Sequence, residues 1–237
     1  MMSDWMKRSL IGSGCLVLAG TAAAQATFVG PVPYTSQAST PAGFYAPDAA
    51  VALEDFEDCS LDEGLSATAG TPVANAAGSG CTGYFGVIDS VDADDGVIDG
   101  SGSNGRSFFS ASGSSGITLT FPYTVEAAGA VWTDGEGLVT FEAFGPGMIS
   151  LGTVGPDALA DGMVTGETAE DRFYGVRDAG GIVAIKLSNA GGGIEIDHVQ
   201  FERAVATPGL GAEAGLVAFL LMATLGAAVL RKRSVAA

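Results

Sequence analysis

His198 is the only histidine of the chain, and it directly follows Asp197. Any serine–histidine–aspartate triad would have to use this imidazole, yet no G-x-S-x-G turn is present to expose a nucleophilic serine. Carboxylates that could act in pairs on a glycosidic bond are abundant, but no pattern selects one pair. The sequence therefore favours a protein that is not an enzyme, with a glycan-active hydrolase as the minor alternative.

Aspartates crowd the stretch IDSVDADDGVIDG, where they occupy positions 89, 92, 94, 95 and 99. Calcium takes six to eight oxygen ligands, and loops rich in aspartate and glycine can supply them. The EF-hand spacing is not met, because the alternation of acidic residues that it requires before Gly96 is broken at Ala93. We interpret the stretch as a solvated acidic loop, with a calcium-binding loop as the alternative.

Two of the three cysteines, Cys59 and Cys81, lie outside the N-terminal segment that holds Cys15. Two cysteines in an exported chain most often form a disulfide. With His198 as the only imidazole, the two thiols cannot complete the usual four-ligand zinc site. The sequence predicts a Cys59–Cys81 disulfide and no zinc.

The charge is strongly one-sided. Between positions 25 and 207 the chain has 25 acidic and 5 basic residues, a formal charge of −20. Such a surface repels nucleic acids and anionic lipids and favours divalent cations. The 47% of apolar residues, which include 12 phenylalanines, argue against a disordered chain. We expect one folded domain and no nucleic-acid partner.

Residues 1–26 have the three parts of a secretory signal peptide. Lys7 and Arg8 form the charged start, residues 9–20 are apolar, and small residues allow cleavage after Ala24 or Ala26. The apolar stretch is short for an uncleaved membrane anchor. We therefore expect the protein to be exported.

The part that we expect to fold is 51–205, preceded by a segment, 27–50, whose four prolines predict an arm or linker. Short runs rich in β-branched and aromatic residues then alternate with Gly, Asp and Ser. Several short strands at this spacing predict an all-β fold, an antiparallel β-sandwich of the jelly-roll type. We expect residues 134–137 to form a hairpin turn. The candidate strands are 51–58, 83–89, 116–122, 128–133, 137–144, 147–154, 171–177, 181–188 and 193–202.

The last candidate strand changes phase. Ile194 and Ile196 share one parity, whereas Val199 and Phe201 share the other. Side chains alternate between the two faces of a strand, so a regular strand cannot direct all four to one side. The pattern predicts a bulge or bend near Asp197 and His198, unless both faces are buried.

The C-terminal segment, 206–237, contains 17 uncharged residues at 214–230, followed by Arg231, Lys232 and Arg233. A helix of this length, about 25 Å, is barely long enough to cross a membrane. The arrangement resembles the sorting tail of PEP-CTERM proteins, which joins a proline-containing motif, a hydrophobic helix and a basic cluster.

This resemblance implies an exosortase-type sorting enzyme as a partner, transient insertion in the inner membrane, and delivery to the cell surface or extracellular matrix. The motif position is held by Thr207, Pro208 and Gly209 instead of Pro-Glu-Pro. A plain single-pass anchor with a cytoplasmic C-terminus is the alternative.

The domain is similar to jelly-roll modules related to galactose-binding-like carbohydrate modules. The matching stretches are LEDFED (53–58), TFPYTVEAAGAVWTDGEG (120–137), FYGV (173–176) and GIEIDHVQF (193–201). By position, the resemblance implies that Glu57 and Asp197 share a structural calcium ion. Trp132 and Tyr174 could stack on sugar rings if exposed, although aromatic residues in such strands more often belong to the core.

The sequence and its resemblances together predict an exported, non-enzymatic protein of the cell surface or matrix that binds polysaccharide with the help of calcium. A purely structural matrix component without a specific ligand is the main alternative.

Overall fold

The computed structural model describes residues 25–62, 64–74, 80–81, 88–91, 105–160 and 170–203. The expected sorting motif at Thr207, Pro208 and Gly209, the hydrophobic segment after it, and nearly all of the signal peptide lie outside these ranges. Among the described residues, none forms a helix with the length and hydropathy needed to span a bilayer.

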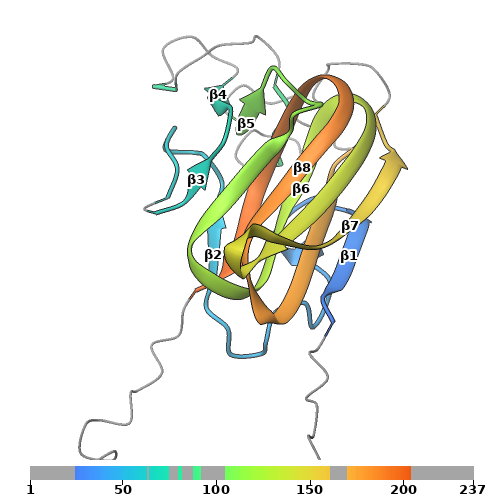
Figure 1. Cartoon of the computed structure of the whole chain (residues 1–237). Helices are drawn as coiled ribbons and strands as arrows, with labels where there is room; N and C mark the ends of the chain where they lie inside the picture. The colour runs from blue at the N-terminus through green and yellow to red at the C-terminus, as the bar shows by residue number, and fades with distance from the viewer. Residues whose placement is uncertain are drawn as a thin grey trace, which may run out of the picture.

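Over the described residues the protein is all-β, and the eight strands found there form one curled antiparallel sheet (Figure 1). Two single 3-10 turns, η1 (Gln37–Ser39) and η3 (Pro146–Met148), interrupt the described strands. The strands are β1 (Thr27–Pro33), β2 (Val51–Glu54), β3 (Ser66–Ala67), β4 (Thr71–Ala74), β5 (Arg106–Ser110), β6 (Ile117–Gly145), β7 (Ile149–Ala158) and β8 (Arg172–Glu202).

The two long strands, β6 and β8, organise the sheet, because each runs through both of its halves. In one half, residues 184–187 of β8 lie between residues 117–120 and 141–144 of β6, with β3 and β7 outside them. In the other half, residues 128–135 of β6 lie between two parts of β8, and β1, β2 and β5 pair with β8. Figure 1 shows both strands curving along the length of the molecule.

The main core fills the space that the curled sheet encloses. Ile117, Leu119 and Phe121 are buried in it, while the threonines between them are half-buried, as strict alternation predicts. Residues of both halves join the same cluster, including Trp132, Phe141, Tyr174, Ile185 and Ile196.

The expected hairpin turn at 134–137 is wrong. β6 continues without a break from Ile117 to Gly145, and the residues on either side of 134–137 pair with β8 rather than with each other. Trp132 pairs with Ile196, and Val139 pairs with Asn189. The glycines, among them Gly137 with φ of 85°, let the strand pass from one half of the sheet to the other.

The segment 27–50 differs from the arm or linker that its prolines suggested. Residues 27–33 form β1, an edge strand that pairs with β8, and edge strands tolerate proline because one side needs no ladder hydrogen bonds. Tyr34 and Phe44 then pack on the outer face of the sheet. They belong to a second apolar cluster with Val91, Ala127, Val131 and Phe173.

Candidate functional site

β8 contains the bulge that the sequence predicted. Asp197 pairs with Val131 of β6, but Gln200 pairs with Gly129, so β8 has one residue more than β6 over this interval. His198 takes a positive φ of 42° at this point. The extra residue allows the apolar residues before and after it to enter the same core: Ile194, Ile196, Val199 and Phe201.

The opposite face of this part of β8 is polar and nevertheless buried. Glu195 and His198 are each 5% exposed, and Asp197 and Gln200 are fully buried. Burying a carboxylate is costly unless it receives hydrogen bonds or meets a positive charge. This buried polar face, defined by Glu195, Asp197, His198 and Gln200, is the candidate functional site.

One cover of the polar face is the short segment 88–91. The backbone amide of Asp89 donates to Oε2 of Glu195 at 2.7 Å, and that of Val91 donates to Oδ2 of Asp197 at 2.9 Å. The Ser90 hydroxyl donates to the same Oδ2 at 3.3 Å. Two buried carboxylates of β8 therefore hold this segment through its backbone.

The other cover is the N-terminal segment after β1. The Tyr34 hydroxyl lies 2.9 Å from Nδ1 of His198 and accepts a hydrogen bond from Nε2 of Gln200 at 2.8 Å. The Thr40 hydroxyl donates to Oε1 of Gln200 at 3.1 Å. The single imidazole of the chain thus takes part in a buried hydrogen-bond chain that fastens residues 34–40 to β8.

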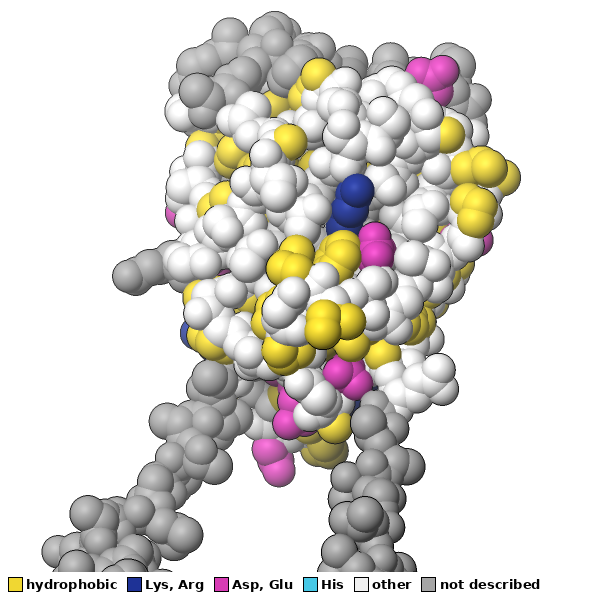
Figure 2. All heavy atoms as spheres, in the orientation of Figure 1, with side chains coloured by type: hydrophobic (Ala, Val, Ile, Leu, Met, Phe, Trp, Pro, Cys, Tyr) yellow, Lys and Arg dark blue, Asp and Glu magenta, His cyan; other side chains and the backbone are white. Residues whose placement is uncertain are grey.

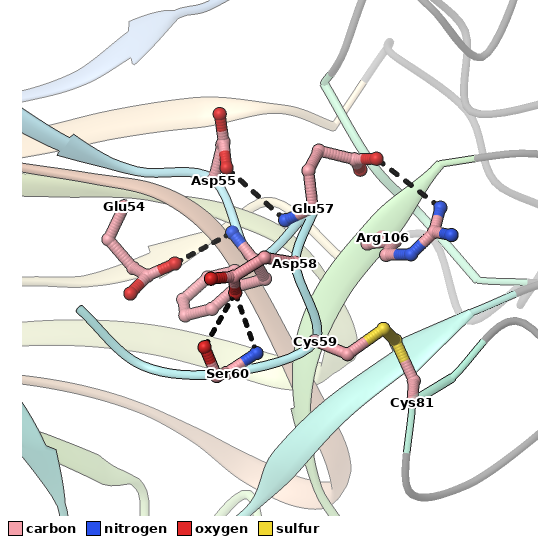
Figure 3. Close-up of a disulfide and its surroundings, with 9 residues drawn as sticks. Glu54, Asp55, Glu57, Asp58, Cys59, Ser60, Cys81 and Arg106 are labelled. Atoms are coloured by element: carbon pink, nitrogen blue, oxygen red, sulfur yellow. Dashed lines mark hydrogen bonds and ion pairs between the residues drawn. A yellow bond between two sulfur atoms is a disulfide. The ribbon is translucent and has the colours of Figure 1, made fainter.

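In the structure, Glu57 and Asp197 contact different elements. Oε2 of Glu57 lies 3.3 Å from a guanidinium nitrogen of Arg106, the first residue of β5 (Figure 3). Asp197 instead accepts hydrogen bonds from segment 88–91 and, through Oδ1, from the His198 amide at 2.6 Å. A shared calcium ion would have to bind beside these contacts or replace them.

Cys59 and Cys81 form a disulfide in the structure. Cys59 lies in a compact turn after β2, where Phe56 and Cys59 both have positive φ (Figure 3). The side chain of Asp58 accepts hydrogen bonds at 2.8 Å from the amide and from the hydroxyl of Ser60. The disulfide joins this turn to Cys81, 22 positions further along the chain.

Glu54 ends β2 and holds the same turn together. Its Oε1 accepts a hydrogen bond from the Phe56 amide at 2.8 Å, and its Oε2 accepts one from the Asp62 amide. Burial raises the pKa of Glu54 to about 7, although these two amide hydrogen bonds act in the opposite direction. The residue is 4% exposed, which agrees with a dominant effect of burial.

Trp132 and Tyr174 are fully buried in the main core. The ring of Tyr174 stacks on Phe141 with centroids 5.8 Å apart, and its hydroxyl donates to Oδ2 of Asp157 at 3.0 Å. These two rings are core residues, the commoner outcome for aromatic residues in strands, and they offer no stacking surface to a sugar.

Two shallow hollows, of about 440 Å³ and about 740 Å³, lie on the surface formed by the described residues. Neither is lined by an aromatic or histidine side chain of the described ranges. Apolar side chains occur in small groups on the face drawn in Figure 2. Leu138 and Ile149 are exposed, but they pair with Ala158 and Gly145 at opposite ends of β7.

Within the ranges that the structure covers, no three side chains of His, Cys, Asp or Glu meet as a metal-binding group. Of the acidic loop, Asp89 is described, whereas Asp92, Asp94, Asp95 and Asp99 fall outside these ranges.

No protein-family model, no curated protein and no solved structure matches the chain.

Proposed function

We propose that the protein is an exported, non-enzymatic component of the cell surface or extracellular matrix, with a jelly-roll β-sandwich as its folded domain. The observation that carries the proposal is the Cys59–Cys81 disulfide. Disulfides persist in oxidising compartments outside the cytoplasm, where a chain with this N-terminal signal would be delivered.

The positions of the chain ends support attachment by a tail. Thr27, at the start of β1, pairs with Arg177, and Glu202, at the end of β8, pairs with Val51. Both ends lie at the same end of the sheet, and β4 and β5 lie at the other (Figure 1). A domain tethered or sorted through residues 206–237 would therefore present the disulfide-bonded end away from the membrane.

The contacts of His198 support a non-enzymatic protein over a hydrolase with a histidine-based triad. Its Nδ1 is hydrogen-bonded to Tyr34, and its side chain lies under the N-terminal segment. A general base must reach the proton of a substrate directly or through one water. This imidazole acts as a structural partner, which disfavours a serine–histidine–aspartate triad; a glycan-active hydrolase would depend on a pair of carboxylates instead.

Polysaccharide binding with a structural calcium ion at Glu57 and Asp197 is part of the proposal on the strength of the resemblance and the formal charge of −20 between positions 25 and 207. Burial of Trp132 and Tyr174 favours the second candidate, a structural matrix component without a specific sugar ligand. Binding to a glycan array in calcium, abolished by a chelator, would support the first. Calcium-dependent self-association without glycan binding would support the second.

The decisive experiment on export is mass spectrometry of the protein recovered from the cell surface or matrix. We expect the mature chain to begin at Gln25 or Thr27 and to lack Arg231, Lys232 and Arg233. An intact basic C-terminus on the surface protein would contradict the sorting hypothesis and favour a plain membrane anchor. An unprocessed N-terminus would contradict export through the signal peptide.

A further inference from the structure

A second bulge lies in β6, beside the polar face of β8. The pairing advances from Trp132–Ile196 to Asp134–Glu195, so Thr133 and Asp134 together stand opposite the single residue Glu195. Bulges re-aim side chains, and they often occur next to functional sites. Two oxygen-bearing side chains of β6 are brought next to a buried carboxylate of β8.

Alternation shows which way these side chains point. Trp132 belongs to the main core, so Thr133 after it faces the outer side of the sheet. Glu195 lies between Ile194 and Ile196, which also belong to the main core, so it faces the same outer side. Thr133 is fully buried and Glu195 is 5% exposed, which means that this part of the outer face is covered.

The hydroxyl of Thr133 is the group that points to a bound ligand. Its Oγ1 is buried and has no hydrogen-bond partner. A buried polar atom without a partner costs about 1–3 kcal/mol. Valine has the same shape without the hydroxyl, so a threonine at this position requires a reason.

The carboxylates beside this hydroxyl carry like charges. Glu195 is 5% exposed, Asp134 stands directly opposite it, and the Asp89 backbone lies against its Oε2. Ionised, Glu195 would need a compensating positive charge. Either a proton on Glu195 or a bound cation would remove the repulsion.

A cation would satisfy more of these groups than a proton would. A proton on Glu195 neutralises that carboxyl group and supplies one O–H donor, but it leaves the charge of Asp134 in place. A hard cation neutralises the carboxylates of Asp134 and Glu195 and also takes a lone pair of the hydroxyl oxygen of Thr133.

We propose that Thr133, Asp134 and Glu195 form a buried binding site for a divalent cation of the calcium class. Calcium binds six to eight oxygen atoms at 2.3–2.6 Å and accepts hydroxyl, carbonyl and water oxygens beside carboxylates. Two carboxylates and one hydroxyl thus provide part of the coordination shell, and backbone or water oxygens complete it. The site does not include Glu57 or Asp197, although Asp197 belongs to the same buried polar face as Glu195, and it does not depend on the proposed export.

The ion would join three elements. It would hold the bulge of β6 to the bulged end of β8, and through Glu195 it would act on segment 88–91, whose Asp89 amide donates to Oε2 of Glu195. Calcium binding is therefore expected to stabilise the fold and to order this cover of the polar face, because an ion that binds only the folded state adds its binding free energy to stability.

The test is thermal unfolding of the purified full-length protein in calcium, in magnesium and in chelator, with calcium affinity from titration calorimetry. Calcium should raise the melting temperature, and magnesium should raise it less because it demands tighter octahedral geometry. Thr133→Val should keep the melting temperature in chelator, or raise it, and should weaken calcium binding by about tenfold or more, as changes at metal sites commonly do. Glu195→Gln should also reduce the calcium effect.

The matched control is Thr140→Val, the same substitution at a half-buried position of β6, which should retain the calcium effect of the unmodified protein. Glu57→Gln separates this site from the one implied by the resemblance, because the part of the calcium effect that belongs to Thr133, Asp134 and Glu195 should persist in that variant. Coincident melts in calcium and chelator, or a full calcium effect in Thr133→Val, would overturn the site. Loss of the effect in Glu57→Gln alone would also overturn it and would locate the ion at Glu57 instead, whatever the outcome of the mass spectrometry on export.

Discussion

The Tyr34 hydroxyl lies 2.9 Å from Nδ1 of His198, although 164 positions separate the two residues. The contact joins the start of the folded chain to the bulge near its end. Gln200 donates to the same hydroxyl, so one phenol oxygen serves two buried polar side chains. The N-terminal segment is therefore fastened to the sheet by a specific polar contact as well as by the packing of Tyr34 on Phe173.

Tyr34→Phe tests this contact. The change keeps the ring and removes the hydroxyl, which leaves His198 and Gln200 each without one buried partner. Unpartnered buried groups cost about 1–3 kcal/mol each, so we expect the free energy of unfolding to fall by about 2 kcal/mol or more. Urea unfolding of the two proteins at neutral pH measures the difference.

Tyr45→Phe is the matched control, because the Tyr45 hydroxyl is buried without a hydrogen-bond partner. Its removal should leave stability unchanged or slightly raised. Equal losses in the two variants would mean that ring packing, and not the hydrogen bonds of Tyr34, accounts for the effect.

The all-β class and the bulge at His198 could be predicted because both follow from local sequence patterns. Alternation over residues 117–121 is enough to indicate a strand with one buried face. The parity change between Ile196 and Val199 lies within one strand, and only an extra residue can return both to the core. Such features need no knowledge of the strand's neighbours.

The course of β6 could not be predicted in the same way. Asp134-Gly135-Glu136-Gly137 has the composition of a hairpin turn, but the same residues suit a strand that bends between the halves of a sheet. The decision depends on β8, whose residues Ile196 and Asn189 pair on either side of the bend. The prolines of β1 led to the wrong prediction of an arm or linker for a similar reason. Whether a strand lies at the edge of a sheet, where proline is tolerated, depends on its neighbours.

The candidate site was reached only in part from the sequence. The irregularity beside Asp197 and His198 was visible, but the burial of Glu195 and its position opposite Thr133 and Asp134 follow from the register of two distant strands. A composition rich in acidic residues gave no reason to choose these carboxylates over the others.

The disulfide should contribute substantially to stability. Cys59 and Cys81 close a loop with a sequence separation of 22, for which the chain-entropy model gives about 3 kcal/mol. We expect the double variant Cys59→Ser/Cys81→Ser to unfold at lower urea concentration by about this free energy. In the exported protein, thiol labelling without reduction should leave both cysteines unmodified, and labelling of both would contradict the disulfide.

The calcium ion proposed from the resemblance has its own test. If Glu57 and Asp197 share an ion, Asp197→Asn and Glu57→Gln should each reduce the calcium-induced rise in melting temperature. Arg106→Gln should enhance it, because the guanidinium that lies 3.3 Å from Glu57 competes with the cation. Unchanged calcium effects in all three variants would exclude an ion at this position.

The pH dependence of stability follows from Glu54 and Glu195. The folded protein keeps the proton of Glu54 up to about pH 7, whereas the unfolded chain releases it near 4.5. The folded state therefore binds more protons in this window, and the free energy of unfolding falls as pH rises from about 4.5 to about 7. The difference amounts to about 3 kcal/mol for Glu54, and the raised pKa of Glu195 acts in the same direction.

Urea unfolding between about pH 4.5 and about pH 8, in the presence of chelator, measures this slope. Glu54→Gln is neutral throughout, so it should flatten the decline, even if the amide weakens one of the two backbone hydrogen bonds and lowers stability at every pH. Glu142→Gln removes a half-buried carboxylate elsewhere on β6 and controls for the loss of one negative charge. A decline in Glu54→Gln as steep as in the unmodified protein would show that burial of Glu54 does not couple its protonation to folding. With calcium added, the decline should become shallower above neutral pH if the ion replaces the proton at Glu195.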